Sequence, residues 1–367
     1  MPASIAHMVI AHKAIEHLQE SGVEPLAAFA RMLDAKDRLY QAYMNLGSIG
    51  PDLYYYANIA KSAKDMLMDG FVQAAGVTPW SYHLHSCRPN EFPLNLCEVL
   101  FSDAVHEEDE VLLDDNDMRK LAYIAGHLTH IAADQIIHPL VNRIAKPYYR
   151  DGKNRRKHQE CEVFQDYFLY EEVYRAERLK QRGRARAKYD FFEQKFNQWV
   201  DCVPKRTTTR NTEDWFRYFL QRGFVQVYGA FPAEETIESS VDNLLLVLRT
   251  CRTVGPYKKA AEEYEKRGAD SKMYQEYIVE SDYMSHYEQA VRLSAVYITA
   301  LYEVYEVHKS GGDISERKSR FLRVVSAADL SCPLETAILD KAYAALSATG
   351  AGGRNPRRPS RGRNVVT

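Results

Sequence analysis

Three titratable residues recur at intervals of four within one apolar stretch, and this pattern sets the tightest limit on how the chain can pack. The residues are His130, Asp134 and His138, and the periodicity of residues 118–144 around them predicts an amphipathic helix. At about 100° per residue, positions i, i+4 and i+8 of a helix fall within a stripe about 80° wide. Small and apolar neighbours indicate that this helix is largely buried. Three buried polar groups need a shared partner, because burying them unpaired is costly.

A metal ion would be such a partner. Neutral imidazoles and carboxylates are ligands that zinc takes, and the two oxygens of Asp134 could bridge two ions. The alternative is a hydrogen-bond network between histidine and aspartate at a helix crossing. The stripe alone leaves both interpretations open.

Histidine is unevenly distributed along the chain. Ten of the 12 histidines lie between His7 and His158, which points to metal or proton chemistry. Further candidate ligands accompany the stripe: the pair His158 and Glu162, four residues apart; Asp52, in a Gly-Pro-Asp turn; His83 or His85, after Trp80; and His7, on the first helix, with His12 also possible. Each of these residues also has an ordinary interpretation without a metal: an exposed histidine–glutamate pair on a helix, a residue that forms a turn, or a residue on a solvated helix face.

The periodicity and the breaker residues predict a chain that is helical nearly throughout. No segment alternates with period two between hairpin turns, and no repeat of 20–50 residues is present, so the fold class is all-α, a compact multi-helix array. Residues 80–95 are expected to be irregular or short, and 150–157 to be a polar loop. Helices are expected at residues 4–19, 25–43, 57–75, 118–144, 158–182, 240–252, 258–267, 285–309 and 333–348.

The predicted organisation is one all-helical domain over residues 1–348, followed by a tail. The candidate metal ligands lie within residues 1–165, and residues 170–348 form a helical extension. Residues 349–367 are rich in Gly, Pro and Ser and contain five arginines, which predicts a disordered basic tail.

Composition narrows the function classes. The chain has 48 basic and 50 acidic residues, so no global basic field favours nucleic acid as a partner. Six scattered cysteines without a CxxC pair indicate reduced, mostly buried thiols. No run approaches the ~18 apolar residues of a membrane span, and no signal peptide begins the sequence. The expectation is a cytoplasmic protein, with export by a non-classical or secretion-system route as the alternative.

In order and chemistry, these features resemble the zinc-dependent phospholipase C family over roughly residues 1–165. Two segments are similar to the N-terminal domain of glycosylphosphatidylinositol-specific phospholipase D: AHMVIAHKAIE at residues 6–16 and LGSIGPD at residues 46–52. The spacing His130-xxx-Asp134-xxx-His138 matches that branch. Secreted bacillary phospholipases C, and fungal single-strand nucleases of related architecture, have a longer gap after the aspartate.

The resemblance implies two or three zinc ions and a set of ligands. One ion would be held by Asp52, His85, His130 and Asp134. Asp134 would bridge to a second ion, which His7 also holds. A third would be held by His138, His158 and Glu162. His85 is preferred to His83 because Leu-His-Ser is the form associated with the family, and His127 is expected to be structural or to lie beside the ligands.

The resemblance also implies the reaction, a phospholipase C-like hydrolysis of phospholipid phosphodiesters by a metal-activated water that attacks phosphorus. Zinc would clamp the phosphate oxygens and lower the pKa of a bound water toward ~7, and Asp52 would orient or deprotonate that water. The neighbouring Tyr54, Tyr55 and Tyr56 are either packing aromatics or the wall of a pocket for a choline-like cation. A membrane surface is the expected place of the substrate.

Two alternatives stay open. One is a zinc-dependent single-strand nuclease, against which the balanced charge and the ligand spacing count. The other is a non-catalytic helical protein that zinc stabilises. Two features depart from secreted family members: six residues precede His7, where those proteins use the mature terminal amino group as a ligand, and a signal peptide is missing.

Overall fold

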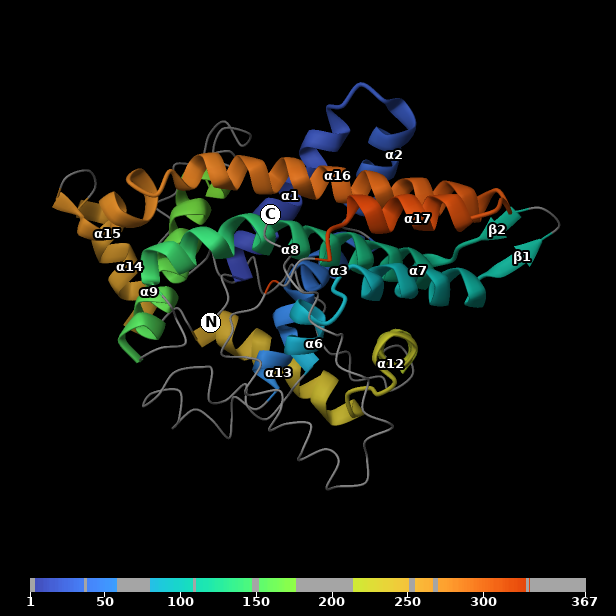
Figure 1. The fold of residues 1–367 in the computed structure, drawn as a ribbon, viewed down its shortest axis with the longest axis horizontal. Coiled ribbons are helices and arrows are strands. Elements are labelled where there is room, and N and C mark those ends of the chain that lie inside the picture. Colours follow the sequence, from blue (N-terminus) through green and yellow to red (C-terminus); the bar gives the residue numbers. More distant parts are fainter. Residues whose placement is uncertain are drawn as a thin grey trace, which may run out of the picture.

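One long helix, α8 (Asp115–Ala145), crosses the middle of the molecule, and α1, α3, α7, α9 and α16 pack against it (Figure 1). The computed structural model describes residues 4–35, 38–57, 80–107, 110–146, 152–175, 214–250, 255–266, 270–327 and 330. The all-α fold class predicted from the sequence is confirmed. A two-stranded antiparallel hairpin is the one sheet within these described residues, with β1 (Val105–Glu107) paired to β2 (Glu110–Leu112).

The remaining elements follow one another along the chain. The first half contains α1 (Ser4–Gln19), α2 (Glu24–Leu33), α3 (Tyr40–Ile49), the 3₁₀ helix η1 (Gly50–Tyr56), α6 (Trp80–Ser86), α7 (Glu91–Asp103), α9 (Gly152–Leu169) and the π-helix η2 (Tyr170–Arg175). The second half contains α12 (Asp214–Tyr228), α13 (Glu234–Thr250), α14 (Gly255–Lys266), α15 (Lys272–Tyr274), the π-helix η5 (Gln275–Val279), α16 (Tyr283–Lys309) and α17 (Ser315–Val324).

The start of α8 is set by its own sequence. The side chain of Asp114 accepts a 2.8 Å hydrogen bond from the main-chain N–H of Asp117, and the side chain of Asp117 accepts one of 3.3 Å from the N–H of Asp114. This reciprocal pair satisfies donors that the first turn of a helix leaves open. From Lys120 to Asp134 every residue of α8 is buried, and its small residues allow close neighbours.

The closest of these neighbours is α3, which crosses α8 at two glycines. A Cβ on Gly126 would lie 2.0 Å from the carbonyl oxygen of Met44, and one on Gly47 would lie 2.0 Å from that of Tyr123. Any larger residue would therefore push the helices apart. Because they touch, the carbonyl of Ser48 reaches the imidazole of His130, 2.9 Å away.

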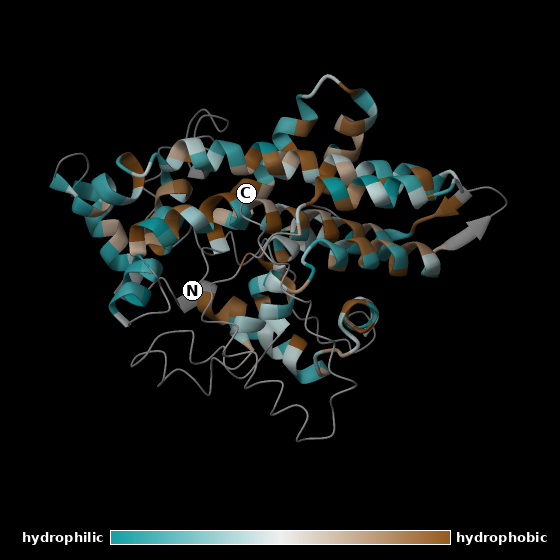
Figure 2. Cartoon of the chain, viewed as in Figure 1, coloured by the Kyte–Doolittle hydropathy of each residue, from teal (hydrophilic) through white to brown (hydrophobic). Residues whose placement is uncertain are grey.

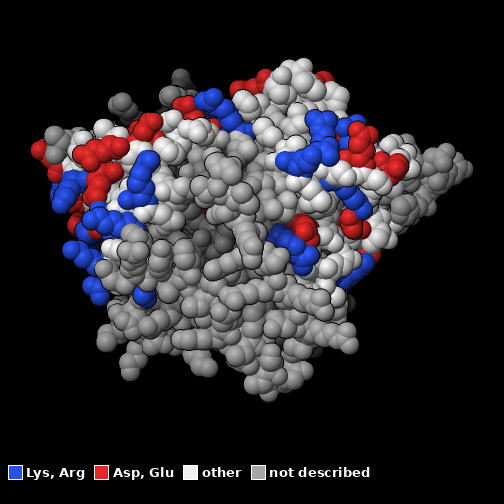
Figure 3. All heavy atoms as spheres, in the orientation of Figure 1, with Lys and Arg blue, Asp and Glu red and all other residues white. Residues whose placement is uncertain are grey.

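Hydrophobic residues gather on the helix faces that meet inside the molecule, and hydrophilic residues cover the outer helices such as α15 and α17 (Figure 2). Within the described residues, no helix combines the length and the apolar character that a membrane crossing requires. On the face shown in Figure 3, basic and acidic side chains of the described residues intermix at both ends of the molecule. That part of the surface has no extended basic stripe of the kind that follows a nucleic-acid backbone.

Several expected boundaries differ from the structure. The helix expected at 25–43 is two helices, α2 and α3, separated by a turn in which Leu39 takes a left-handed φ of 65°. Helix α3 runs six residues past the expected end, to Ile49, and the crossing with α8 accommodates Gly47 inside it. The irregular stretch expected at 80–95 contains α6 and the start of α7, and α9 begins within the polar segment 150–157.

Some expectations fall on other parts of the chain. Residues 58–75, 333–348 and 349–367 lie outside the described residues. The division into a domain at 1–348 and a tail therefore stays a prediction.

Candidate metal centre

Helix α8 presents three of the predicted ligands on one face, as the spacing of four residues indicates. His130 Nε2 lies 3.1 Å from Asp134 Oδ2, and His138 Nε2 lies 3.5 Å from Asp134 Oδ1. The side chains of His130 and Asp134 are almost fully buried, whereas that of His138 is partly exposed. The carboxylate of Asp134 therefore stands between two imidazoles of its own helix.

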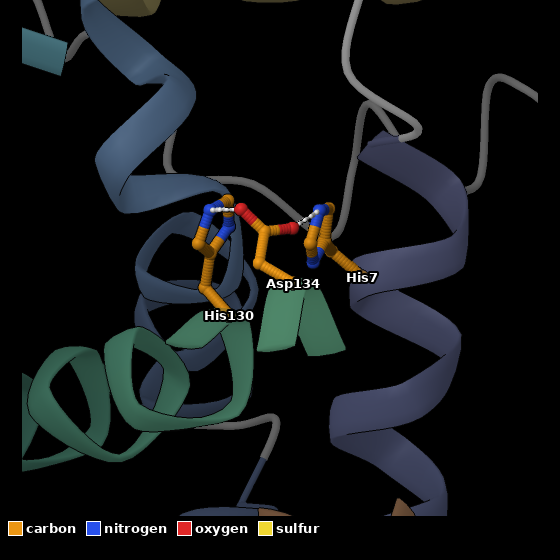
Figure 4. A group of neighbouring side chains, drawn as sticks. All are labelled: His7, His130 and Asp134. Carbon is orange, nitrogen blue, oxygen red and sulfur yellow. Dashed lines mark ion pairs between the residues drawn. The ribbon is translucent and has the colours of Figure 1, made fainter. Parts of the chain in front are cut away.

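Asp134 also meets a histidine from the first helix (Figure 4). His7 Nε2, on α1, lies 3.4 Å from Asp134 Oδ1, and its ring stacks on that of His130 with centroids 4.1 Å apart. Each oxygen of Asp134 thus faces a different set of imidazoles. This arrangement suits a carboxylate that bridges two cations.

Two further predicted ligands approach from η1 and α6. His85 Nε2 lies 3.2 Å from Asp52 Oδ1 and 3.4 Å from Asp134 Oδ2, and the other oxygen of Asp52 lies 3.9 Å from His7 Nε2. Asp52 and His85 are both buried. The turn after α3 brings Asp52 here, because η1 follows α3 directly past the glycine crossing.

The last pair comes from α9, which packs along the other end of the α8 ligand face. His158 Nε2 lies 3.0 Å from Glu162 Oε1, and His138 Nε2 lies 3.6 Å from the same oxygen. His138 therefore stands between Asp134 and Glu162 and joins the two halves of the cluster.

The structure brings all eight predicted ligands together in three groups, the first two of which share His130. Within each group the potential donor atoms lie within 4.8 Å of one another. The groups are His7 with His130 and Asp134; Asp52 with His85 and His130; and His138 with His158 and Glu162. His83, the alternative to His85, belongs to none of them, since it packs against Tyr228 with ring centroids 4.9 Å apart.

Main-chain carbonyls orient three of the imidazoles. The Nδ1 atoms of His85, His130 and His138 lie 2.5, 2.9 and 2.9 Å from carbonyl oxygens. These carbonyls belong to Ser81, Ser48 and Leu330, respectively. Because a carbonyl only accepts, each Nδ1 donates to it, and the Nε2 atom of each ring is the one that faces the cluster.

The resulting set of atoms calls for a cation. The Nε2 atoms of His85 and His130 lie 3.3 Å apart, and both face the same oxygen of Asp134. Atoms of this kind lie so close together only when a proton or a metal cation lies between them. Histidine and carboxylate donors held in this orientation are what zinc binds. The residues present therefore fit the metal that the sequence predicts.

Without a metal, the groups of the cluster differ in protonation. Burial lowers the pKa of His85, but hydrogen bonds with Asp134 and Asp52 raise it more, and the net pKa is well above the ordinary value. Zinc would therefore displace a proton from this ring. Burial, together with the neighbouring His130, lowers the pKa of His7 to about 4, so its ring is neutral near pH 7. Burial raises the pKa of Asp134, but the nearby imidazoles of His138 and His130 lower it more, and the net pKa is well below the ordinary value. Neutral imidazoles and ionised carboxylates are the forms that bind a metal.

An aspartate that the sequence analysis did not single out holds α1 in place. Asp166, on α9, accepts hydrogen bonds from the main-chain N–H groups of Ala6 at 2.7 Å and Ile5 at 3.3 Å, and from the hydroxyl of Tyr257 at 2.7 Å. It thereby caps the first turn of the helix that carries His7. Nothing local marks this role, since the cap lies 160 residues away in the sequence.

Two other expectations concern residues beside the ligands. His127 is fully buried next to the ring of Phe92 and belongs to none of the three groups. Tyr54 packs edge-on against Phe224, and the hydroxyl of Tyr56 pairs with Ser4 Oγ at 2.8 Å, so both are packing residues. Tyr55 is half-buried, and its ring centroid lies 6.0 Å from that of His85.

A cavity of about 20 Å³ adjoins the cluster and is lined in part by His7, Asp134, His138, Glu162 and Tyr283. This volume admits a single water-sized group. Burial raises the pKa of Tyr283 well above its ordinary value, so its hydroxyl keeps its proton. A hydrogen-bond donor, two carboxylates and two imidazoles therefore belong to residues that line one cavity.

No curated protein and no solved structure matches the chain. A family model described as zinc dependent phospholipase C matches residues 6–220, a range that holds all eight residues of the three groups. The chain therefore belongs to the zinc-dependent phospholipase C family.

Proposed function

We propose that this protein is a zinc-dependent phosphodiester hydrolase that acts on phospholipids in the manner of a phospholipase C. The observation that carries the proposal is the position of Asp134, whose two oxygens each lie within 3.5 Å of two imidazoles. A structural zinc site is closed by four ligands, whereas eight converging ligands exceed what one closed site needs. Membership in the family supports the same conclusion.

The proposed ligands divide into three sets, and the first two share Asp134. Asp52, His85, His130 and Asp134 would hold one ion, and His7 with Asp134 would hold the second. His138, His158 and Glu162 would hold the third. When bound, zinc supplies a Lewis acid that polarises a phosphoryl oxygen and lowers the pKa of water.

The protein's own residues contribute orientation and a base. Asp52 lies between His85 and His7, with one oxygen 3.2 Å from the first and the other 3.9 Å from the second. A carboxylate in this position can hold an attacking water by a hydrogen bond and accept its proton. Three ligands stand on one buried helix, so the site is held on a rigid element.

The test combines metal analysis with product analysis. Purified wild type, Asp134→Ala and Asp115→Ala would each be assayed for zinc content and for diacylglycerol released from phosphatidylcholine vesicles. Asp115 is a matched control, because it is an exposed carboxylate at the start of the same helix. We expect zinc and diacylglycerol with wild type and Asp115→Ala, and a large loss of both with Asp134→Ala.

Two results would contradict the proposal. Zinc-replete protein that cleaves single-stranded DNA but no lipid would identify a nuclease. Zinc-replete protein that cleaves neither would identify a helical protein in which zinc is only structural.

A further inference from the structure

A tyrosine hydroxyl at the start of α16 is buried beside the metal centre without a hydrogen bond. Tyr283 is 0% exposed, and its hydroxyl has no hydrogen-bond partner in the part of the chain that the structure describes. Buried polar groups are nearly always paired, so an unpaired one calls for an explanation. Tyr283 also lies well outside residues 6–220, the range that the family model matches.

The surroundings of this hydroxyl indicate what it would bind. Tyr283 lines the cavity that His7, Asp134, His138 and Glu162 also line. The cavity has room for about one water-sized group, which is the size of a single oxygen atom of a larger ligand. An oxygen drawn to cations held by these four residues would be anionic, and a tyrosine O–H is a suitable donor to it.

The backbone before Tyr283 has an unusual conformation. Asp282 has φ 54° and ψ 43°, in the left-handed region that residues other than glycine seldom adopt. The π-helix η5 ends three residues earlier, at Val279. Irregular backbone of these two kinds is frequent near functional sites, where it re-aims a side chain. Here it begins α16 at the point where Tyr283 meets the cavity.

We propose that the Tyr283 hydroxyl donates a hydrogen bond to a phosphate oxygen of the ligand that enters this cavity. The assignment rests on the proposed function, because it takes the metal centre to be the site of a phosphodiester. It adds a substrate-binding residue that is distant in the sequence from every proposed metal ligand. No bond forms or breaks in this contact, and the proton stays on the tyrosine.

The test uses the full chain, loaded with zinc, and inorganic phosphate as the ligand. Tyr283→Phe removes the hydroxyl and little else, and Tyr287→Phe is its control, a buried tyrosine one turn further along α16 that does not line the cavity. Zinc content, unfolding by urea without phosphate, and phosphate affinity by calorimetry would be measured for each. We expect Tyr283→Phe to weaken phosphate binding by about tenfold or more, because the donor faces an anion.

The other two measurements separate a binding role from a structural one. With Tyr283→Phe, zinc content should stay at the wild-type level, and stability without phosphate should be equal or higher, because an unpaired hydroxyl is removed. Phosphate affinity that is unchanged in Tyr283→Phe, or equally weakened in Tyr287→Phe, would overturn the proposal. So would a loss of zinc or of stability in Tyr283→Phe, which would make the residue structural. Phosphate binding needs no lipid, so failure of lipid hydrolysis is read separately, from diacylglycerol release.

Discussion

The carboxylate of Asp166 accepts a 2.7 Å hydrogen bond from the main-chain N–H of Ala6, the residue before His7. Asp166 lies one helical turn after Glu162 on α9. The same helix therefore carries a proposed ligand of one metal group and fixes the position of a proposed ligand of another. The metal groups are linked through backbone as well as through Asp134.

Replacing Asp166 with alanine should loosen the first turn of α1. Three hydrogen bonds are lost, and buried donors are left unpaired, so we expect the free energy of unfolding to fall by about 1–3 kcal/mol. His7 would lose its fixed position, and zinc affinity should fall with it. Both effects are checked by urea unfolding and by competition with a zinc chelator. Asp166→Asn keeps an acceptor for Ala6 and should retain most of the zinc affinity; wild-type affinity in Asp166→Ala would contradict this role.

Asp166 should also make stability depend on pH. Burial is the largest effect on its pKa and outweighs the hydrogen bonds from Tyr257 and Ala6, so the pKa rises from 3.8 to about 7. The folded state then holds the proton more tightly than the unfolded state. This contribution to stability is complete below the unfolded pKa and is lost as pH rises through about 7. Relative to Asp166→Asn, which does not titrate, the free energy of unfolding of the wild type should fall by up to about 1.4 kcal/mol per pH unit between the unfolded pKa of 3.8 and the folded pKa of about 7. Urea unfolding of both proteins at pH 5, 6, 7 and 8 measures the difference, and a constant difference would refute it.

The glycine crossing of α3 and α8 should tolerate no side chain. A Cβ on Gly126 would lie 2.0 Å from the carbonyl oxygen of Met44, so Gly126→Ala must move one helix. We expect a destabilisation of about 1–3 kcal/mol and weaker zinc binding, since the Ser48 carbonyl would no longer orient His130. Gly152→Ala is the control, because a Cβ there meets nothing within 4 Å. Its stability, measured by thermal unfolding, should be unchanged or slightly higher.

A segment that follows α17 takes part in the metal centre through its main chain. The N–H of Leu330 donates to the carbonyl of His85 at 2.9 Å, and its own carbonyl accepts from His138 Nδ1 at 2.9 Å. Leu330→Pro removes the donor and disturbs the carbonyl, so we expect lower zinc affinity. Leu330→Ala keeps both main-chain groups and should bind zinc more tightly than Leu330→Pro. Equal zinc affinities of the two variants in a chelator titration would argue against the contact.

Removing the metal should destabilise the whole protein. The Nε2 atoms of His85 and His130 lie 3.3 Å apart beside Asp134, so a metal bound by these residues would link α6 to α8. A chelator should therefore lower the melting temperature, and added zinc should restore it. The comparison is made with Asp134→Ala, whose melting temperature should respond much less to chelator. An equal response of the two proteins would mean that zinc acts elsewhere.

Local sequence patterns predict many of the helices and the ligand face of α8. The spacing of His130, Asp134 and His138 indicates one helix face, and the structure has them on α8. The first helix, Ser4–Gln19, has the expected bounds, because its ends are marked by residue type. The break between α2 and α3 was missed, since helix-forming residues continue through it and the turn depends on how α3 meets α8.

The partners of the ligands were not predictable in the same way. Asp166, Tyr283 and the carbonyls of Ser48, Ser81 and Leu330 leave no motif, because any residue has a carbonyl and single aspartates and tyrosines are common. The three carbonyls orient imidazoles only because packing brings each within 3 Å of a ring nitrogen. The roles of Asp166 and Tyr283 likewise depend on which helices pack together.

Residue order alone therefore determines the helical class and a set of candidate ligands, because helix periodicity and side-chain chemistry are local properties. Only the folded chain decides that His85 rather than His83 meets Asp134, that α9 caps α1, and that Tyr283 is buried beside the cluster. These are distances between residues far apart in the sequence, and they are set by how closely helices can approach one another.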